Sequence, residues 1–332
     1  MQHILVITLS NLGDVIMTTP VIMALAARFP SARLTVLVGP KARALLDKSP
    51  QIHQVVVYDK KADWRRKWRV LRGLRQVRYD YVVDLRHTPI PWLLRCKQRS
   101  PLFRRFRKTN QRDRHWEILE MMGFNLPSPP VLPFFDETDV RVSLEKLRTK
   151  GILSPGGWIV AAPGAASEKK RWPVASFQTV LGELVKRTGC PIVLVGAPNE
   201  RPIAEAVAQE LSGTTIVLCG ETTINQTAAL LSKAVLILAN DSAIMHLGFE
   251  LDVPTVGIFG PTRHEQYGHV GQRFRIAHAD ATRCSCNTQL IPKHERSCFH
   301  GLQAEQVLAL CMALLKTIPQ ADSTRIPDHK PA

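Results

Sequence analysis

The sequence has no apolar run long enough to cross a bilayer. Its apolar stretches at residues 4–9 and 235–239 fall far short of the roughly 20 residues that a spanning helix needs. The opening residues also lack the basic segment of a secretory signal peptide. We therefore expect a cytoplasmic protein, in which the seven cysteines remain reduced thiols.

Two phosphate-binding motifs and one metal-binding motif are also missing. The turn after the first predicted strand lacks G-x-G-x-x-G, and G-x-x-x-x-G-K-[ST] occurs nowhere. These absences disfavour a dinucleotide-dependent dehydrogenase and a P-loop NTPase. There is no Asp-x-Asp triplet either, the usual carboxylate pair that holds Mg²⁺ on a diphosphate.

Positive charge is abundant and unevenly distributed. The 332 residues include 44 Lys and Arg against 28 Asp and Glu, a formal net charge of +16. Residues 60–115 contain 19 Lys and Arg against four acids and hold nearly all of this excess. Such a basic segment implies an anionic partner: nucleic acid, an anionic membrane surface or a phosphorylated substrate.

Apolar strands alternate with amphipathic helices along most of the chain. The predicted strands are residues 3–9, 34–38, 54–58, 80–85, 158–162, 192–196, 216–219, 235–239 and 255–259. The predicted helices are residues 15–29, 41–47, 64–78, 140–150, 177–188, 201–211, 223–232, 243–251 and 302–317. Pro20 is expected to kink the first helix or to start a second one. The alternation predicts an α/β protein with two Rossmann-like, doubly wound parallel sheets.

A break rich in Ser, Pro and Gly at residues 154–157 divides the chain. We predict an N-terminal domain over residues 1–153, a C-terminal domain over 158–318 and a loose tail over 319–332. Ligands of such sheets bind beyond the carboxyl ends of the strands. The loops at residues 11–14, 163–172, 196–200 and 240–246 are therefore expected to line a central cleft that the two domains face.

Residues 235–251, VLILANDSAIMHLGFEL, are the most informative stretch. A buried strand leads directly to Asn240, Asp241 and Ser242, all favourable N-cap residues, and then to a helix. Free backbone N–H groups and the positive end of the helix dipole make this turn an anion site, with Asp241 and His246 beside it. The alternative is an ordinary capped helix with an incidental histidine.

The loop at residues 163–173 suits a diphosphate. A turn at Gly164 lets backbone N–H groups approach, and Lys169, Lys170 and Arg171 supply positive charge. The alternative is a solvated basic loop.

The segment at residues 64–78 predicts a basic amphipathic helix, in which Trp64, Trp68 and Leu71 share a face and arginines lie between them. It suits contact with a membrane or an acceptor. In the alternative interpretation, the tryptophans belong to the core and the arginines are solvated.

A third cluster invites a zinc interpretation but has the wrong spacing. Its members are Cys284, Cys286, His294, Cys298 and His300. A C-x-C pair followed by a gap of eleven residues is not the standard C-x₂₋₄-C arrangement, and we interpret the segment as a structured loop without metal.

Taken in order, five stretches of this sequence resemble glycosyltransferase family 9, the ADP-heptose:lipopolysaccharide heptosyltransferases of Gram-negative bacteria. The matching stretches are residues 4–20 (ILVITLSNLGDVIMTTP), 163–173, 219–223 (CGETT), 240–247 (NDSAIMHL) and 257–262 (GIFGPT). The resemblance extends from about residue 1 to residue 317.

This resemblance implies a GT-B fold with an acceptor-binding N-terminal domain and a nucleotide-sugar-binding C-terminal domain. The implied reaction is inverting, metal-independent transfer of a heptose from ADP-heptose to a lipopolysaccharide inner-core sugar, without a cofactor. The implied partners are a lipid A–core acceptor, which is anionic, and the anionic inner-membrane surface. We expect a monomer that is peripheral to the cytoplasmic face of that membrane and binds no nucleic acid.

By motif position, Asp14 resembles the catalytic base of the family and Lys170 its phosphate-binding lysine. Asp14 could instead be a carboxylate that merely stabilises a helix N-terminus. The candidate donor-binding residues are Ala165, Ala166, Lys170, Arg171, Glu200, Asp241, Ser242, Ala243 and His246. The candidate acceptor-binding residues are Asn11, Gly13 and Arg86.

The sequence departs from the family pattern at Thr8, where the family usually has a cation, and at Ala243, where it usually has Gly. Either change could mean another sugar or acceptor, so an epimerase or a transferase of the same fold remains an alternative. A nucleic-acid-binding protein is the alternative from another class, although the basic segment matches no helix-turn-helix, zinc-finger or RNP pattern.

Overall fold

The computed structural model describes residues 1–8, 11–152, 157–260, 262–279, 299 and 301–317. Most of the predicted linker, the cluster from Cys284 to His300 and the predicted tail lie outside these residues. The chain forms two compact units. Unit 1 comprises Met1–Asp139, Ile224–Ala229 and Glu265–Gly268, and unit 2 comprises Val140–Thr223, Leu230–His264 and His269–Ala332.

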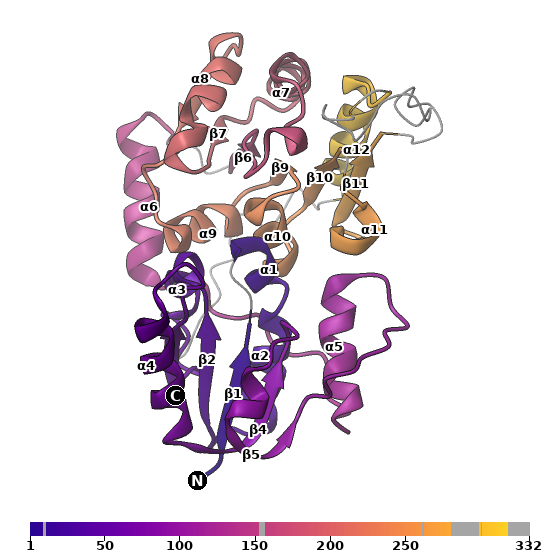
Figure 1. The fold of residues 1–332 in the computed structure, drawn as a ribbon. Helices are drawn as coiled ribbons and strands as arrows, with labels where there is room; N and C mark the ends of the chain where they lie inside the picture. The colour runs from indigo at the N-terminus through magenta and orange to yellow at the C-terminus, as the bar shows by residue number, and fades with distance from the viewer. Residues whose placement is uncertain (9–10, 153–156, 261, 280–298, 300, 318–332) are drawn as a thin grey trace. The chain divides into compact units, whose positions relative to one another are not determined.

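Unit 1 is built on a five-stranded, wholly parallel sheet in the order β3-β2-β1-β4-β5 (Figure 1). Its strands are β1 (His3–Ile7), β2 (Arg33–Val38), β3 (Gln54–Val57), β4 (Arg78–Asp84) and β5 (Arg95–Arg99). The central strand β1 is buried from Ile4 onward, as its near-continuous apolar sequence predicts. The strand order reverses between β1 and β4, which makes their carboxyl ends the switch point of this sheet.

Two helices, α1 and α2, occupy the region where a helix over residues 15–29 was predicted. The helices are α1 (Leu12–Ile16), α2 (Thr19–Arg28), η1 (Pro40–Ala42), α3 (Arg43–Leu46), α4 (Trp64–Arg75), η2 (Ile90–Leu93) and α5 (Gln111–Met121). Thr18 and Thr19 donate side-chain hydrogen bonds to Val15 O and Ile16 O, which closes α1, and Pro20 lies in the first turn of α2. The prediction that Pro20 starts a second segment is confirmed.

Unit 2 is built on a six-stranded parallel sheet in the order β11-β10-β9-β6-β7-β8. Its strands are β6 (Ile159–Ala162), β7 (Ile192–Leu194), β8 (Thr215–Val217), β9 (Leu236–Asn240), β10 (Thr255–Phe259) and β11 (Phe274–His278). The strand order reverses between β6 and β9, whose carboxyl ends form the switch point of unit 2. The prediction of two doubly wound parallel sheets is confirmed.

The remaining helices are α6 (Glu137–Thr149), η3 (Glu168–Lys170), α7 (Val174–Thr188), η4 (Pro198–Glu200), α8 (Arg201–Gln209), α9 (Ile224–Ser232), α10 (Ala243–Glu250), α11 (His264–Tyr267) and α12 (Ala304–Thr317). No helix among the described residues is both long and apolar enough to span a bilayer. This finding agrees with the short apolar runs of the sequence.

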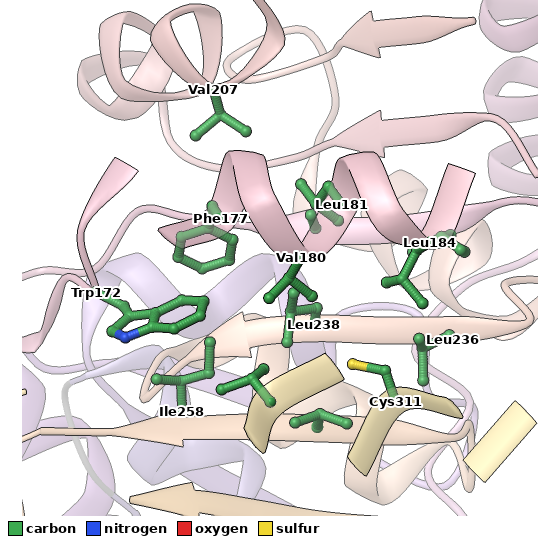
Figure 2. Close-up of a cluster of buried hydrophobic side chains, with 14 of the residues drawn as sticks. Trp172, Phe177, Val180, Leu181, Leu184, Val207, Leu236, Leu238, Ile258 and Cys311 are labelled. Atoms are coloured by element: carbon green, nitrogen blue, oxygen red, sulfur yellow. The ribbon is translucent and has the colours of Figure 1, made fainter. Parts of the chain in front are cut away.

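Both faces of the unit 2 sheet are covered. Leu236 and Leu238 of β9 pack in one cluster with Phe177 and Leu181 of α7 and with Cys311 of α12 (Figure 2). Because neighbouring strand residues point to opposite faces, the residue between the two leucines, Ile237, turns to the other side and meets α10. The approach of α10 there requires a glycine: a Cβ on Gly248 would lie 2.4 Å from Thr255 Oγ1 and 2.9 Å from Ile237 Cδ1.

We predict that Gly248→Ala lowers the free energy of unfolding by about 1–3 kcal/mol, because a methyl group there overpacks the α10–sheet contact. Thr255 cannot yield easily, since it is fully buried and its hydroxyl donates to Val253 O. The matched control is Gly182→Ala in α7, where the nearest atom to the new Cβ is 4.0 Å away. There the better helix propensity of alanine should stabilise by about 0.5–1 kcal/mol. Denaturant unfolding of both variants tests the contact, and equal stability of Gly248→Ala and the parent contradicts it.

Candidate functional site

The switch point of unit 2 brings two loops together. The loop that follows β6 begins at Pro163, and the turn that follows β9 begins directly after Asn240, the last residue of that strand. The Asn240 side chain is fully buried and joins them: its Oδ1 accepts from Trp172 N at 3.1 Å, and its Nδ2 donates to Pro163 O at 2.7 Å. Trp172 is itself buried in the unit 2 core against Phe177 (Figure 2). Both ends of the loop at residues 163–172, which we call the basic loop, are therefore held at the carboxyl end of the sheet.

Lys170 and Asp241 meet at this end of the sheet although 71 residues separate them. Lys170 Nζ lies 2.7 Å from Asp241 Oδ2, and Asp241 Oδ1 lies 3.9 Å from His246 Nε2. The Asp241 side chain is 5% exposed whereas that of Lys170 is 34% exposed. The pair is therefore open on the side of the lysine, and an ammonium held in this way can also meet an anion from solvent.

The N-terminus of α10 carries a buried hydroxyl that caps no backbone group. Ser242 is the N-cap residue in extended conformation, but its side chain makes no capping hydrogen bond. Its Oγ is buried, and no hydrogen-bond partner lies near it among the described residues; the same is true of Thr262 Oγ1. A buried polar atom without a partner costs free energy unless a water or a ligand satisfies it. The Ser242 hydroxyl and the first N–H groups of α10 are therefore donors suited to an anion.

Glu200 lies between the ends of β6 and β7. A Cβ on Gly164 would fall 2.4 Å from Glu200 Cδ, and a Cβ on Gly196 would fall 2.7 Å from Glu200 Oε2. Ala197 N donates to that same Oε2 at 2.7 Å. The carboxylate therefore reaches the sheet edge only because both neighbours lack a side chain. A carboxylate in this position is suited to accept hydrogen bonds from ribose hydroxyls.

The other candidate donor residues have different surroundings. Arg171 Nε donates to Ala165 O at 3.1 Å, so this guanidinium helps to shape the loop. Ala165 is buried, Ala166 is exposed and Ala243 is half-buried. Gly164 was expected in the turn of the diphosphate loop and Gly196 in a loop that lines the cleft, but the room that both glycines leave for Glu200 was not predicted.

The switch point of unit 1 holds Asp14 in the first turn of α1. Asn11 Nδ2 donates to Asp14 Oδ2 at 3.0 Å, which orients the carboxylate. Gly13, between them, is half-buried. Thr8, where the family usually has a cation, is buried and shares a 2.8 Å hydrogen bond with Thr18.

Arg86 and Lys60 are two cations of unit 1 with different surroundings. Arg86 follows β4, in a turn shaped by the buried Asp84, which accepts from Arg86 N at 2.8 Å. Lys60 is exposed; partial desolvation and then repulsion by Arg86 lower its pKa, while the Asp14 carboxylate opposes the shift. Lys60 therefore interacts electrostatically with both Arg86 and Asp14. Sequence reasoning identified Arg86 but missed Lys60, which was only one of many cations in the basic segment.

His115 of α5 is buried, interacts electrostatically with Asp14 and was also missed, because α5 was not predicted. Burial lowers the pKa of His115 to about 4, although a hydrogen bond to Met17 O and the charge of Asp14 act in the opposite direction. The imidazole is therefore neutral near pH 7, and Nδ1, 3.3 Å from Met17 O, is its donor.

No group of three or more His, Cys, Asp or Glu side chains that could hold a metal ion occurs within the described part of the chain. Cys284, Cys286, His294, Cys298 and His300 lie outside that part.

Comparison with known proteins identifies the family. Lipooligosaccharide heptosyltransferase 2 of Campylobacter jejuni subsp. jejuni serotype O:2 is 25% identical over 314 residues, which cover 92% of this chain and 96% of that protein. Lipopolysaccharide heptosyltransferase 3 of Escherichia coli is 25% identical over 284 residues, or 76% of this chain and 82% of that protein.

Two solved structures share the fold. The glycosyl transferase family 9 structure from Veillonella parvula has a TM-score of 0.79 at 23% identity and covers 95% of this chain and 97% of its own. The E. coli ADP-heptose lps heptosyltransferase II has a TM-score of 0.73 at 21% identity and covers 95% and 99%. The predicted GT-B fold is thereby confirmed.

A family model also matches residues 114–296, under the description glycosyltransferase family 9 (heptosyltransferase). Because this match spans more than half of the chain, the protein belongs to glycosyltransferase family 9 and is a glycosyltransferase.

Proposed function

We propose that the protein transfers a heptose from ADP-heptose to an inner-core sugar of lipopolysaccharide, with inversion and without a metal ion. The group of donors at the switch point of unit 2, which we call the anion site, supports this most directly. It combines the N-terminus of α10, the Ser242 hydroxyl and the Lys170 ammonium. The named activities of the relatives supply the sugar and the acceptor class.

In this proposal the diphosphate of the donor occupies the anion site. Lys170 and the α10 N–H groups neutralise it and stabilise the additional negative charge that develops as ADP leaves. Glu200 accepts hydrogen bonds from the ribose. Asp241, His246 and Ala243 face the sugar side, and Ala165, Ala166 and Arg171 form the loop around the phosphates.

Asp14 acts as the general base in unit 1. It takes the proton from the acceptor hydroxyl as that oxygen attacks the anomeric carbon and the bond to the diphosphate breaks. Attack opposite to the leaving group inverts the anomeric centre. Asn11 orients the base, Gly13 leaves room beside it, and Lys60 and Arg86 attract the anionic acceptor.

The acceptor is expected to be lipid-anchored, so we place the enzyme at the cytoplasmic face of the inner membrane, as a monomer that needs no cofactor.

The buried Thr8, which pairs with Thr18, supports one variant of this proposal, a transferase for another acceptor or sugar, because Thr8 stands where the family usually has a cation. The decisive experiment measures ADP release and product mass with ADP-heptose and a panel of other nucleotide sugars. Transfer that requires a different donor contradicts the heptose assignment.

We predict that Asp14→Asn lowers turnover by a factor of about 10² to 10⁴, the usual contribution of a general base. Donor affinity, measured by titration calorimetry, should change little, because Asp14 belongs to unit 1 and the phosphate contacts belong to unit 2. Asp47→Asn, an exposed carboxylate of the same unit, is the matched control and should retain activity. Turnover of Asp14→Asn close to that of the parent excludes Asp14 as the base.

We also predict that Lys170→Ala both weakens donor binding and slows transfer, because the ammonium interacts with charge present in the donor and with charge formed later. Lys169→Ala removes the same charge one residue earlier and should change both quantities less. Equal effects of the two substitutions indicate a general electrostatic contribution and contradict a specific role for Lys170.

A third prediction concerns the metal. Turnover should remain unchanged after treatment with EDTA followed by gel filtration, because Lys170 and the α10 N-terminus supply the charge stabilisation. Loss of activity that Mg²⁺ restores contradicts the metal-independent mechanism.

A further inference from the structure

Helix α4 packs only part of its apolar face. Leu74 is buried in the cluster with Leu5, Tyr79 and Ile90, and Val70, Leu71 and Val77 pack at its margin. The two tryptophans of the helix do not follow them: Trp64 is 71% exposed and Trp68 is 51% exposed. The alternative in which these tryptophans belong to the core is therefore wrong.

A second exposed apolar segment adjoins α4. Ile90 of η2 and Leu74 of α4 share the same cluster, and the two elements contact one another. On the outside of η2, Trp92 is 55% exposed and Leu93 is 45% exposed. Exposed indoles and an exposed aliphatic side chain thus come from two neighbouring elements of unit 1.

Arginines surround these side chains. The spacing of Trp64, Trp68, Arg72 and Arg75 places them on one face of α4. Arg72, Arg75 and Arg95 line a common pocket with Trp68. The Arg99 guanidinium lies 4.8 Å from the Trp92 ring centroid, and that of Arg65 lies 5.6 Å from the Trp64 ring centroid.

The positive charge of this pocket is uncompensated. No ion pair involves Arg72, Arg75 or Arg95 among the residues that the structure describes. Arg95 on the edge strand β5 also lies directly opposite Arg78 on β4. Like charges in register repel one another, so an anion bound here would relieve an unfavourable arrangement.

We propose that this Trp–Arg face docks on an anionic lipid bilayer. The Trp–Arg face consists of Trp64, Trp68, Trp92, Leu93, Arg72, Arg75 and Arg95. Indole rings prefer the headgroup level of a bilayer, the leucine enters the acyl boundary, and the guanidinium groups bind lipid phosphates. Nucleic acid matches the charge equally well but has no hydrocarbon layer for Leu93. The proposal specifies the membrane contact of the proposed function and rests on that function only for the choice of membrane.

The experiment is flotation of the full chain with vesicles of phosphatidylcholine, with or without phosphatidylglycerol, at low salt. The parent should float with the anionic vesicles and remain in solution with the neutral ones. The triple substitution Arg72→Gln, Arg75→Gln, Arg95→Gln should reduce partitioning about 100-fold, because each arginine near an anionic surface contributes about fivefold. Trp64→Gln with Trp68→Gln should reduce it as well while leaving the net charge unchanged.

The matched control, Arg141→Gln with Lys186→Gln and Arg187→Gln, removes the same charge from exposed positions of unit 2 and should float like the parent. Equal losses in both triple variants, or failure of the parent to float, overturn the proposal. Displacement of the parent from vesicles by RNA at sub-stoichiometric amounts also overturns it in favour of a nucleic-acid surface. Transfer to a delipidated acceptor, measured in parallel, should be the same in all variants, so a failed docking face is distinguished from a failed transferase assignment.

Discussion

The buried amide of Asn240 is the contact on which the unit 2 site depends. It forms two hydrogen bonds across the junction of β6 and β9, to Pro163 O and from Trp172 N, and it is fully shielded from water. Leaving either group unsatisfied in such a place costs about 1–3 kcal/mol. The basic loop is therefore held at both ends, which allows Lys170 to meet Asp241 at the edge where the helix dipole of α10 begins.

The two units have similar topology, but the charges at their switch points differ. At the switch point of unit 2, a buried carboxylate holds a partly exposed lysine beside a helix N-terminus, so the edge is suited to negative charge. At the switch point of unit 1, the charge of the half-buried Asp14 acts on Lys60 and on the buried His115, whose imidazole is neutral near pH 7. A base that must accept a proton benefits from neutral surroundings on its buried side, whereas cations on its open side can attract an anionic acceptor.

Predictions from periodicity found every strand that has a neighbour on both sides, but they missed β5 and β11, two of the four edge strands. The strand at residues 255–259 has the predicted bounds, because a fully buried parallel strand must be apolar throughout. The strand β5, with the sequence RCKQR, was missed because an edge strand needs hydrogen bonds from only one neighbour and no apolar alternation. The edge strand β11 and helix α5 were missed as well, the latter because its apolar positions are few among charged ones.

The sequence alone determined the fold class, most of the buried strands and amphipathic helices, and the family, because these depend on local periodicity and on motifs that are contiguous in the chain. It also identified Asp14, Lys170 and Asp241 as candidates. Only the tertiary structure decided that Lys170 pairs with Asp241, that Lys60 and His115 lie near Asp14, and that Trp64 and Trp68 are exposed. Burial and pairing depend on neighbours that are distant in the sequence. The amphipathic pattern of α4 suits a helix that buries all its apolar residues and equally one that leaves two tryptophans in solvent. The extent of the adjoining sheet and of η2 determines which of the two occurs.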